Sequence, residues 1–477
     1  MSGYQPVDPD LAAEDLGRVH LIGVGGVGMS GLARLLITRG VPTSGSELHD
    51  WPSLPELASL GGTIYREHVP ANLDGVDTVV YSTAIPADHL ELVEARRRGL
   101  RILHRAQALA VTMNHRKVVA VAGTHGKTTT TAMLAWVLAE SGLDPSYVIG
   151  GEISRRASNG QHGAGDTFVV EADESDRSFL LYTPYAGIVT NIEADHLNTY
   201  GDLAGLHRGF FEFAQRIRPD GFLVACADDP GARRLIDRAR AAGITVHTYG
   251  EAADATLVLA KLSTDAAGVR YHASLDGDEL GEFGLPSPGR HLGLNSAAAL
   301  LTAVKLGVPP LTVAATLATF PGVRRRFELK GVVDDVRVYD EYAYHPTSIR
   351  VALQTLRSVA GDGRLIAVFQ PYRVYRTRDM EAEIAAALAV ADDAIVMEVF
   401  GPGEQRAPGE GGESLTRAVA LPDERKVFVP EWAGVPAEVA ARARPGDVVV
   451  TMGAPPISLM GDELLTALAT RTGPAGP

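Results

Sequence analysis

The feature that most constrains the fold of this chain is an order of elements that repeats along the whole sequence. Short β-branched runs are followed by Gly- or Asp-rich turns and then by segments rich in Ala and Leu. Strands that alternate with helices in this way predict an α/β fold of parallel sheets with helical crossovers. At roughly 100–200 residues per domain, the 477 residues suffice for about three domains.

Changes in this pattern predict where the domains begin and end. A polar stretch at residues 114–117 separates the first unit from the second. We expect the three units to cover residues 1–115, 116–327 and 328–477. The first and third are expected to be Rossmann-like, and the second to be a P-loop ATPase-like domain with a mostly parallel sheet. Weak alternation over residues 251–285 predicts a small antiparallel insertion.

Charge and cysteine content limit the class of partner. Lys and Arg total 44 and Asp and Glu total 58, so the formal charge is −14. Such an acidic chain is not expected to bind nucleic acid, whose phosphates it would repel. The single cysteine, Cys226, cannot form an intrachain disulfide, which favours a cytoplasmic location. We expect neither a signal peptide nor a membrane span, and the sequence makes no prediction of oligomeric state.

A glycine loop in the middle unit predicts an ATP site. The run GTHGKT at Gly123–Thr128 lies between a predicted strand and a predicted helix. The standard pattern G-x-x-x-x-G-K-[ST] would need glycine at Val121, so this is a shortened form. Glycines let backbone N–H groups surround phosphate oxygens, and the helix N-terminus adds positive potential. Lys127 can then reach the β- and γ-phosphates, and Thr128 can bind Mg²⁺.

Polar clusters follow two further strands of the same unit. The acidic run Glu171–Asp176 follows one strand, and the run Asn191–His196 follows another. We expect these strands to be neighbours, so that Glu171 and His196 face Thr128 across a metal ion. Mg²⁺ prefers hard oxygen ligands. A solvated acidic face is the alternative, but the position directly after a core strand favours a metal site.

A second glycine loop lies near the N-terminus. Gly23–Gly28 fits the dinucleotide fingerprint G-x-G-x-x-G, and Glu47 follows the next predicted strand. Alone, this loop suggests a nicotinamide dehydrogenase. Its chemistry suits any diphosphate, however, including that of a nucleotide sugar, and tight packing of strand on helix without a ligand is the structural alternative.

Long motifs spread over essentially the whole chain together resemble the Mur ligase family. They are Gly23–Gly31, Ser82–Ile85, Arg105–Gln107, Gly123–Thr131, Glu171–Asp176, Thr190–His196, Gly322–Phe327, Asp340–Pro346 and Phe369–Arg378. The resemblance implies an ATP-dependent carbon–nitrogen ligase of peptidoglycan precursor synthesis. ATP would convert the carboxylate of UDP-N-acetylmuramate into an acyl phosphate, which the amine of an amino acid would attack.

The resemblance also implies roles for individual residues. The expected ATP-binding residues are Gly123, Thr124, His125, Gly126, Lys127, Thr128, Thr129, Asn295, Arg326 and Tyr342. The expected catalytic residues are Lys127, His196 and Arg326, and the expected Mg²⁺ ligands are Thr128, Glu171 and His196. The UDP-substrate is expected at Gly25, Gly26, Val27, Gly28 and His68. The amino acid is expected at Tyr344, His345, Tyr372, Arg373 and Arg376.

Departures from the family pattern concentrate in the third unit. Tyr344 stands where the family has the first His of its His-His pair, Tyr372 replaces a His, and Pro455 replaces a Gly. A phenol in place of an imidazole removes a titratable base and changes the pocket volume.

Two ligase hypotheses follow from these departures. In one, the chain adds L-alanine to UDP-N-acetylmuramate. In the other, it is a paralogue with an altered amino acid, with or without an altered acyl donor, in a specialised-metabolite pathway, and L-alanine is not its best acceptor. A dehydrogenase leaves Lys127-Thr128 unused, and a non-catalytic nucleotide-binding regulator leaves Glu171 and His196 unused.

Overall fold

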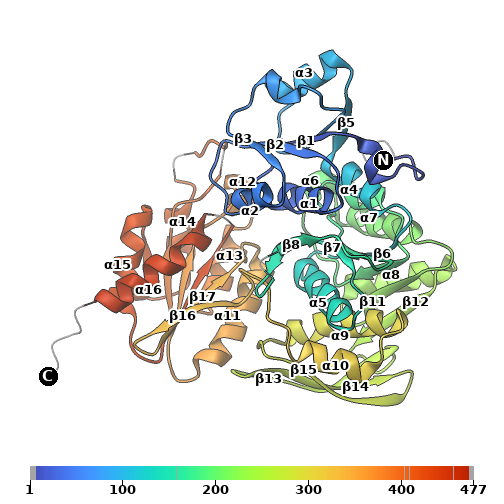
Figure 1. The fold of residues 1–477 in the computed structure, drawn as a ribbon. Coiled ribbons are helices and arrows are strands. Elements are labelled where there is room, and N and C mark those ends of the chain that lie inside the picture. Colours follow the sequence, from blue (N-terminus) through green and yellow to red (C-terminus); the bar gives the residue numbers. More distant parts are fainter. Residues whose placement is uncertain (1–6, 157, 402, 408, 455, 472–477) are drawn as a thin grey trace. The chain divides into compact units, whose positions relative to one another are not determined.

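The computed structural model describes residues 7–156, 158–401, 403–407, 409–454 and 456–471. Its chain forms three sheets, shown with their helices in Figure 1. These belong to two compact units. The first comprises Met1–Leu262, Arg270–Leu285 and Leu292–Pro321, and the second comprises Ser263–Val269, Pro286–His291 and Gly322–Pro477. No helix among the described residues is long and apolar enough to cross a bilayer.

The N-terminal sheet of the first unit is parallel throughout, in the order β3-β2-β1-β4-β5. Its strands are β1 (Val19–Ile22), β2 (Thr43–Ser46), β3 (Thr63–Tyr65), β4 (Thr78–Tyr81) and β5 (Arg101–His104). Its helices are α1 (Val27–Thr38), α2 (Ser53–Ser59), α3 (Leu90–Arg98) and α4 (Arg105–Met113). α1 and α2 cover one face and α3 the other (Figure 1). Because β1 is central and its four residues are all buried, the loop that follows it opens at the middle of the sheet edge.

The second sheet of this unit has ten strands in the order β15-β14-β13-β12-β11-β10-β6-β9-β7-β8. The strands are β6 (Lys117–Ala122), β7 (Ser146–Ile153), β8 (Ser158–Gln161), β9 (Thr167–Glu171), β10 (Ala186–Val189), β11 (Phe222–Cys226), β12 (Val246–Gly250), β13 (Leu257–Asp265), β14 (Gly268–Leu275) and β15 (Asp278–Leu285). The helices are α5 (Lys127–Glu140), α6 (Leu197–Tyr200), α7 (Leu203–Gln215), α8 (Pro230–Ala241), α9 (Arg290–Lys305) and α10 (Pro310–Leu317).

The predicted insertion at 251–285 does form strands, but these strands extend the main sheet. β13 pairs in parallel with β12, and β14 and β15 continue from it. The prediction of strands at 251–285 is confirmed, whereas their attachment to the main sheet was not predicted. The reason is that the alternation reports one half-buried face, which an edge of a large sheet has as well.

The sheet of the second unit has the order β16-β17-β21-β18-β19-β20. Only the β16–β17 hairpin is antiparallel. The strands are β16 (Glu328–Val333), β17 (Val336–Glu341), β18 (Leu365–Phe369), β19 (Asp393–Val396), β20 (Lys426–Phe428) and β21 (Val448–Met452). The helices are α11 (Pro346–Ala360), α12 (Val374–Asp379), α13 (Glu381–Leu388), α14 (Gly412–Ala418), α15 (Val435–Arg442) and α16 (Gly461–Thr470).

The predicted α/β fold with mostly parallel sheets is confirmed. In all three sheets the central strands are apolar and buried, which is what crossover helices on both faces require. The polar loops after these strands consequently gather at the carboxyl edges. The boundaries at residues 115 and 327 stay predictions.

Candidate active site

The phosphate loop of the first unit connects β6 to α5. Gly123 and Gly126 have φ angles of +133° and +83°, which residues with a Cβ rarely adopt. A Cβ on Gly123 would lie 2.0 Å from the hydroxyl oxygen of Thr190, because the loop passes closely over the segment after β10. The N–H of His125 donates to the side chain of Asn191 in that segment at 2.9 Å. Glycine conformation and the neighbouring strand together set the shape of this loop.

Lys127, the first residue of α5, folds back onto the phosphate loop. Its Nζ donates to the carbonyl of Gly123 at 2.7 Å and to the carboxylate of Glu174 at 2.9 Å. Burial alone would lower the pKa of Lys127, but the carboxylates of Glu174 and Asp173 raise it above its usual range. The lysine is therefore charged at neutral pH, and its ammonium group lies beside a loop of the kind that binds phosphate.

Glu174 was predicted only as one member of an acidic run. Its side chain is 2% exposed, and burial raises its pKa to about 7 although Lys127 opposes that shift. The hydroxyl of Tyr200 donates to its backbone carbonyl at 2.7 Å. The carboxylate that meets the lysine is thus held by the core and is not part of a solvated face.

Thr128 and Glu171, two of the expected metal ligands, are in direct contact. The hydroxyl of Thr128 lies 3.1 and 3.0 Å from the two carboxylate oxygens of Glu171. Glu171 is the last residue of β9, and it also accepts the N–H of Gly150 at 2.8 Å. Because β6 and β9 are neighbours, the start of α5 and the end of β9 meet at one sheet edge. Both side chains offer hard oxygen ligands.

His196 lies beyond the opposite side of β6. The expectation that the strands before Glu171 and His196 are neighbours is wrong, since β9 and β10 flank β6 on its two sides. Both strands run parallel to β6, so their carboxyl ends still share an edge with the phosphate loop. His196 has a φ of +52°, and its Nε2 lies 3.5 Å from the carboxylate of Asp195.

Asn295 and Thr129 complete the part of the predicted ATP site that lies in the first unit. Asn295, on α9, is buried against the phosphate loop, and a Cβ on Gly126 would lie 2.7 Å from its Oδ1. Thr129 is buried in the first turn of α5. The sequence offered no spacing argument for Asn295, because α9 follows more than one hundred and fifty residues after the loop.

The N-terminal glycine loop, with Gly25, Gly26, Val27 and Gly28, connects β1 to α1. The carboxylate of Glu47 accepts the N–H of Gly25 at 3.2 Å. In the dinucleotide fingerprint, an acid at this position binds the ribose of the cofactor. Here it fastens the glycine loop, which disfavours the dehydrogenase alternative.

Arg105 also lies at this loop, although sequence reasoning included it only as part of a motif. It begins α4, and a Cβ on Gly28 would lie 3.2 Å from its guanidinium. Its position could have indicated this role, because Arg105 directly follows a parallel strand. Residues in that position lie at the carboxyl edge of the sheet, where ligands bind. A guanidinium beside backbone N–H groups is well suited to a phosphate.

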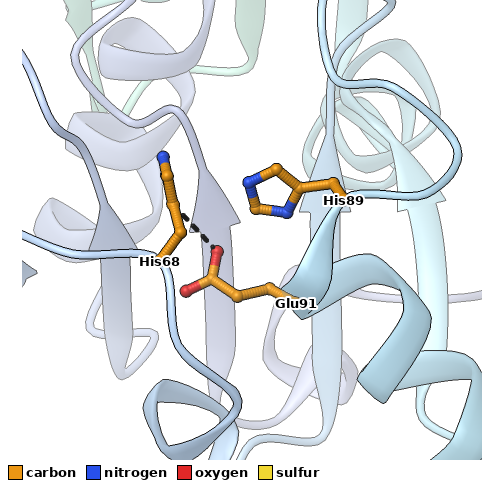
Figure 2. A group of neighbouring side chains, drawn as sticks. All are labelled: His68, His89 and Glu91. Carbon is orange, nitrogen blue, oxygen red and sulfur yellow. Dashed lines mark hydrogen bonds and ion pairs between the residues drawn. The ribbon is translucent and has the colours of Figure 1, made fainter.

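His68 lies at the same edge, in the segment after β3. Its Nδ1 is 2.9 Å from the hydroxyl of Ser46 and 3.2 Å from Oε2 of Glu91. The ring of His89 meets the ring of His68 edge-on, with centroids 4.6 Å apart. Figure 2 shows the carboxylate of Glu91 reaching toward His68 from the start of α3. Glu91 and His89 were not among the residues predicted for this site.

In the second unit, Arg325 and Arg326 enclose the ring of Tyr342. Their guanidinium carbons lie 4.5 and 4.8 Å from its centroid. Burial raises the pKa of Tyr342 to about 12. Burial also raises the pKa of Glu341 to about 7, although Arg326 opposes that shift from 3.9 Å away. Arg326 and Tyr342, both expected at the nucleotide, are therefore brought together.

The two tyrosines that depart from the family pattern are in contact. The rings of Tyr344 and Tyr372 have centroids 5.5 Å apart, and the ring of Tyr342 lies 5.5 Å from that of Tyr344. The guanidinium of Arg376 stacks on Tyr344 at 4.6 Å. Arg376 is buried, so its side chain has one fixed place against an aromatic wall. Pro455, the third departure, lies outside the described residues.

Arg373 and His345 are each committed to a local partner. A guanidinium nitrogen of Arg373 lies 3.2 Å from the carboxylate of Glu404. His345 begins α11, where its Nδ1 accepts the N–H of Thr347 at 3.4 Å. The guanidinium carbon of Arg373 also lies 5.2 Å from the ring centroid of Tyr372, so each of the two predicted arginines stacks on a tyrosine that departs from the family.

These features fit an ATP-dependent ligase built on parallel α/β sheets, with two separate glycine loops whose chemistry suits phosphate groups. Three family models match the chain: the Mur ligase family catalytic domain at residues 18–117, the Mur ligase middle domain at 121–303, and the Mur ligase glutamate ligase domain at 325–455. The chain belongs to the Mur ligase family. The predicted family and the predicted ligase class are confirmed.

Individual relatives agree with this assignment. The UDP-N-acetylmuramate–L-alanine ligase of Salinispora arenicola is 67% identical over 97% of this chain and 90% of its own. The enzyme of the same name from Acidothermus cellulolyticus is 49% identical over 99% and 98%. Among solved structures, the UDP-N-acetylmuramate-alanine ligase MurC of Thermotoga maritima has a TM-score of 0.79 at 28% identity, covering 94% of this chain and 98% of that one.

Proposed function

We propose that this chain joins the amine of L-alanine to the carboxylate of UDP-N-acetylmuramate, with ATP, in the synthesis of a peptidoglycan precursor. The observation that carries the proposal is the 67% identity to a relative named for that reaction. Relatives at 66% and 49% identity have the same name, which disfavours a specialised-metabolite paralogue. We place the reaction in the cytoplasm, and we assign the UDP-substrate to residues 1–115, ATP to 116–327 and the amino acid to 328–477.

The residues around the phosphate loop fit ATP and Mg²⁺. The cradle at Gly123 and Gly126 has no room for a Cβ, as expected where backbone N–H groups approach phosphate oxygens closely. Thr128 and Glu171 would hold one Mg²⁺, and His196 a second. When bound, ATP supplies the phosphoryl group that converts the substrate carboxylate into an acyl phosphate.

The chain's own charged groups would stabilise that transfer. Lys127 is held by Glu174 at 2.9 Å, where its charge can neutralise the negative charge that builds on the transferred group. Thr129 would supply a helix N–H group to the phosphates, and Thr124 and His125 would shape the loop around them, because the N–H groups of both donate to Asn191. We propose Asn295 and Tyr342 for the adenine side, and Arg326 for the phosphates.

The N-terminal glycine loop would bind the diphosphate of the other substrate. Gly25–Gly28 open α1, whose N-terminus favours an anion. Arg105 would add a charged fork beside Gly28. His68 would lie near the uracil base.

The aromatic wall in the second unit would hold the amino acid. Arg376, fixed on Tyr344, is the group we propose for its carboxylate, with His345 and Arg373 at the sides of the pocket. Tyr344 and Tyr372 are larger than the histidines that the family has there and lie against each other, so we expect this wall to favour an amino acid with a small side chain such as a methyl group.

The test is phosphate release with UDP-N-acetylmuramate and each common amino acid in turn. We expect release to need both substrates, to stop with EDTA, and to have its highest kcat/KM with L-alanine. Reactions that lack either substrate are the controls. A preference of more than about tenfold for another amino acid would refute the acceptor, and silence with every amino acid would refute the acyl donor.

A further inference from the structure

The cluster around His68 lies at the point where the N-terminal sheet changes direction of winding. His68 follows β3 on one side of β1, whereas His89 and Glu91 follow β4 on the other. Ligands of doubly wound sheets lie in the crevice at such a point, outside the carboxyl ends of the strands. The side chain of Glu91 is completely buried, while that of His68 remains 19% exposed.

Glu91 is an acceptor for every polar group that reaches it. The hydroxyl of Ser46 donates to its Oε2 at 2.7 Å, and the amide of Asn72 donates to its Oε1 at 2.7 Å. Burial alone would raise the pKa of Glu91, but the hydrogen bonds from His20, Ser46 and Asn72 lower it to about 2. The carboxylate is therefore ionised at neutral pH and has no proton to give.

These partners determine which nitrogen of His68 carries a proton. Nδ1 faces only Oε2 of Glu91 and the hydroxyl of Ser46, whose single proton is already given to Glu91. Two acceptors on one side require Nδ1 to be the N–H. Nε2 of the neutral ring then holds a lone pair, and it lies on the side of the ring away from Glu91 (Figure 2).

We propose that Glu91 is a positioning residue that fixes His68 as the Nδ1–H tautomer, so that Nε2 accepts the N3–H of uracil and rejects cytosine. This inference rests on the proposed use of a UDP-sugar. Sugar hydroxyls can donate or accept, so they require no fixed tautomer, and an ionised diphosphate can only accept, so it does not suit a lone pair on Nε2. Cytosine has a lone pair at N3, which would face the lone pair of His68. The acetamido N–H of the sugar is a competing donor, and bare UDP, which lacks it, separates the two.

A metal ion is the other chemistry that these side chains suggest. His68, His89 and Glu91 offer ligand atoms within 4.8 Å of one another. A cation would have to displace Ser46 and Asn72, which already hold the two oxygens of Glu91. Base selection that needed added Zn²⁺ would therefore overturn the proposal, and selection that persists in EDTA supports it.

The experiment measures Kd for UDP and for CDP by calorimetry, in EDTA, with the full-length protein. We expect the wild type to bind UDP at least about tenfold more tightly, which corresponds to about 1.4 kcal/mol. In Glu91→Gln, Asn72 keeps the Gln oxygen on its own side, so the Gln NH₂ faces His68 and donates to Nδ1. The ring must then carry its proton on Nε2, and the preference for UDP should vanish or reverse.

Glu94→Gln, one turn further along α3, is the matched control, because Glu94 pairs with Arg97 and Arg98 on the same helix and its replacement should leave the ratio unchanged. Equal weakening of both nucleotides in Glu91→Gln would mean a merely structural role and would overturn the inference. A wild type that binds UDP and CDP equally would do the same while leaving the proposed function intact. A wild type that binds no UDP would refute the proposed function itself.

A second measurement does not depend on the folding of Glu91→Gln. In ¹⁵N-histidine-labelled wild-type protein, NMR distinguishes protonated from unprotonated ring nitrogens, and His68→Phe assigns the signals. We expect His68 to have a protonated Nδ1 and an unprotonated Nε2 in the free protein. A proton on Nε2 would overturn the proposal.

Discussion

The Nζ of Lys127 lies 2.9 Å from Oε1 of Glu174. The ammonium group on the first residue of α5 is therefore held in place by a carboxylate from the segment after β9. The two residues are 47 positions apart in the sequence. Pairing with a buried carboxylate keeps the long lysine side chain from moving freely in solvent, and directs its charge at the loop.

Lys127→Ala should lower kcat by more than about a hundredfold, because it removes the charge that opposes the charge on the transferred phosphoryl group. Phosphate release under saturating substrates measures the effect. Lys261→Ala, at an exposed lysine of β13, is the control and should keep wild-type activity. If the Lys127 variant retained more than a few per cent of activity, the ATP assignment would be wrong.

Gly126→Ala should abolish ATP binding. The new Cβ would lie 2.7 Å from Oδ1 of Asn295 in a backbone with a φ of +83°. Gly142→Ala separates the two effects, since Gly142 has a φ of +80° and nothing within 4 Å of an added Cβ. Both variants bear the roughly 1–2 kcal/mol cost of a left-handed conformation, but only the first disturbs the loop. Calorimetric titration with ATP is the measurement, and equal binding by the two variants would contradict the placement of Asn295.

Arg376→Lys should raise KM for L-alanine by about tenfold or more and change KM for ATP little. A lysine cannot make the paired hydrogen bonds of a guanidinium to a carboxylate, nor stack on Tyr344 in the same way. Arg378→Lys, on the same helix and paired with exposed Asp379, is the control. Steady-state kinetics with each substrate varied in turn measures the two KM values. A rise confined to KM for ATP would contradict the assignment of Arg376 to the amino acid.

Glu341→Gln should remove a pH dependence of stability. Burial raises the pKa of Glu341 to about 7 from an ordinary value of about 4.5, so the folded protein holds this proton more tightly than the unfolded chain. The stability that Glu341 contributes to the folded protein is therefore fully present below about pH 4.5 and is lost as the pH rises through about 7. The loss is of order 3 kcal/mol at most.

Urea unfolding at pH 5 and at pH 7.5 measures this effect. The free energy of unfolding of the wild type should fall between the two pH values more than that of Glu341→Gln. Gln can still accept the N–H of Phe327, which Glu341 accepts at 2.7 Å, so the variant keeps that contact. Parallel pH profiles for the two proteins would show that Glu341 titrates normally.

Much of the fold could be predicted from local pattern. The run Val118–Ala122, the glycine turn and the Lys127-Thr128 pair predict a strand, a phosphate loop and a helix, because each signal lies within a few residues of the next. At 251–285 the strands were predicted correctly, but the pattern made no prediction of the sheet that they join.

The sequence by itself determined the fold class, the phosphate loop and the family, since these depend on short motifs and on the order of elements. Only the tertiary structure decided which residues meet. It put Glu91 beneath His68, Glu47 on Gly25, Glu404 against Arg373, and β9 and β10 on opposite sides of β6. The physical reason is that sequence spacing specifies which residue ends a strand, whereas the order of strands across a sheet specifies its neighbours. Tyr344 and Tyr372 illustrate the difference. The sequence identified each as a departure from the family, and the fold brought their ring centroids to 5.5 Å from each other.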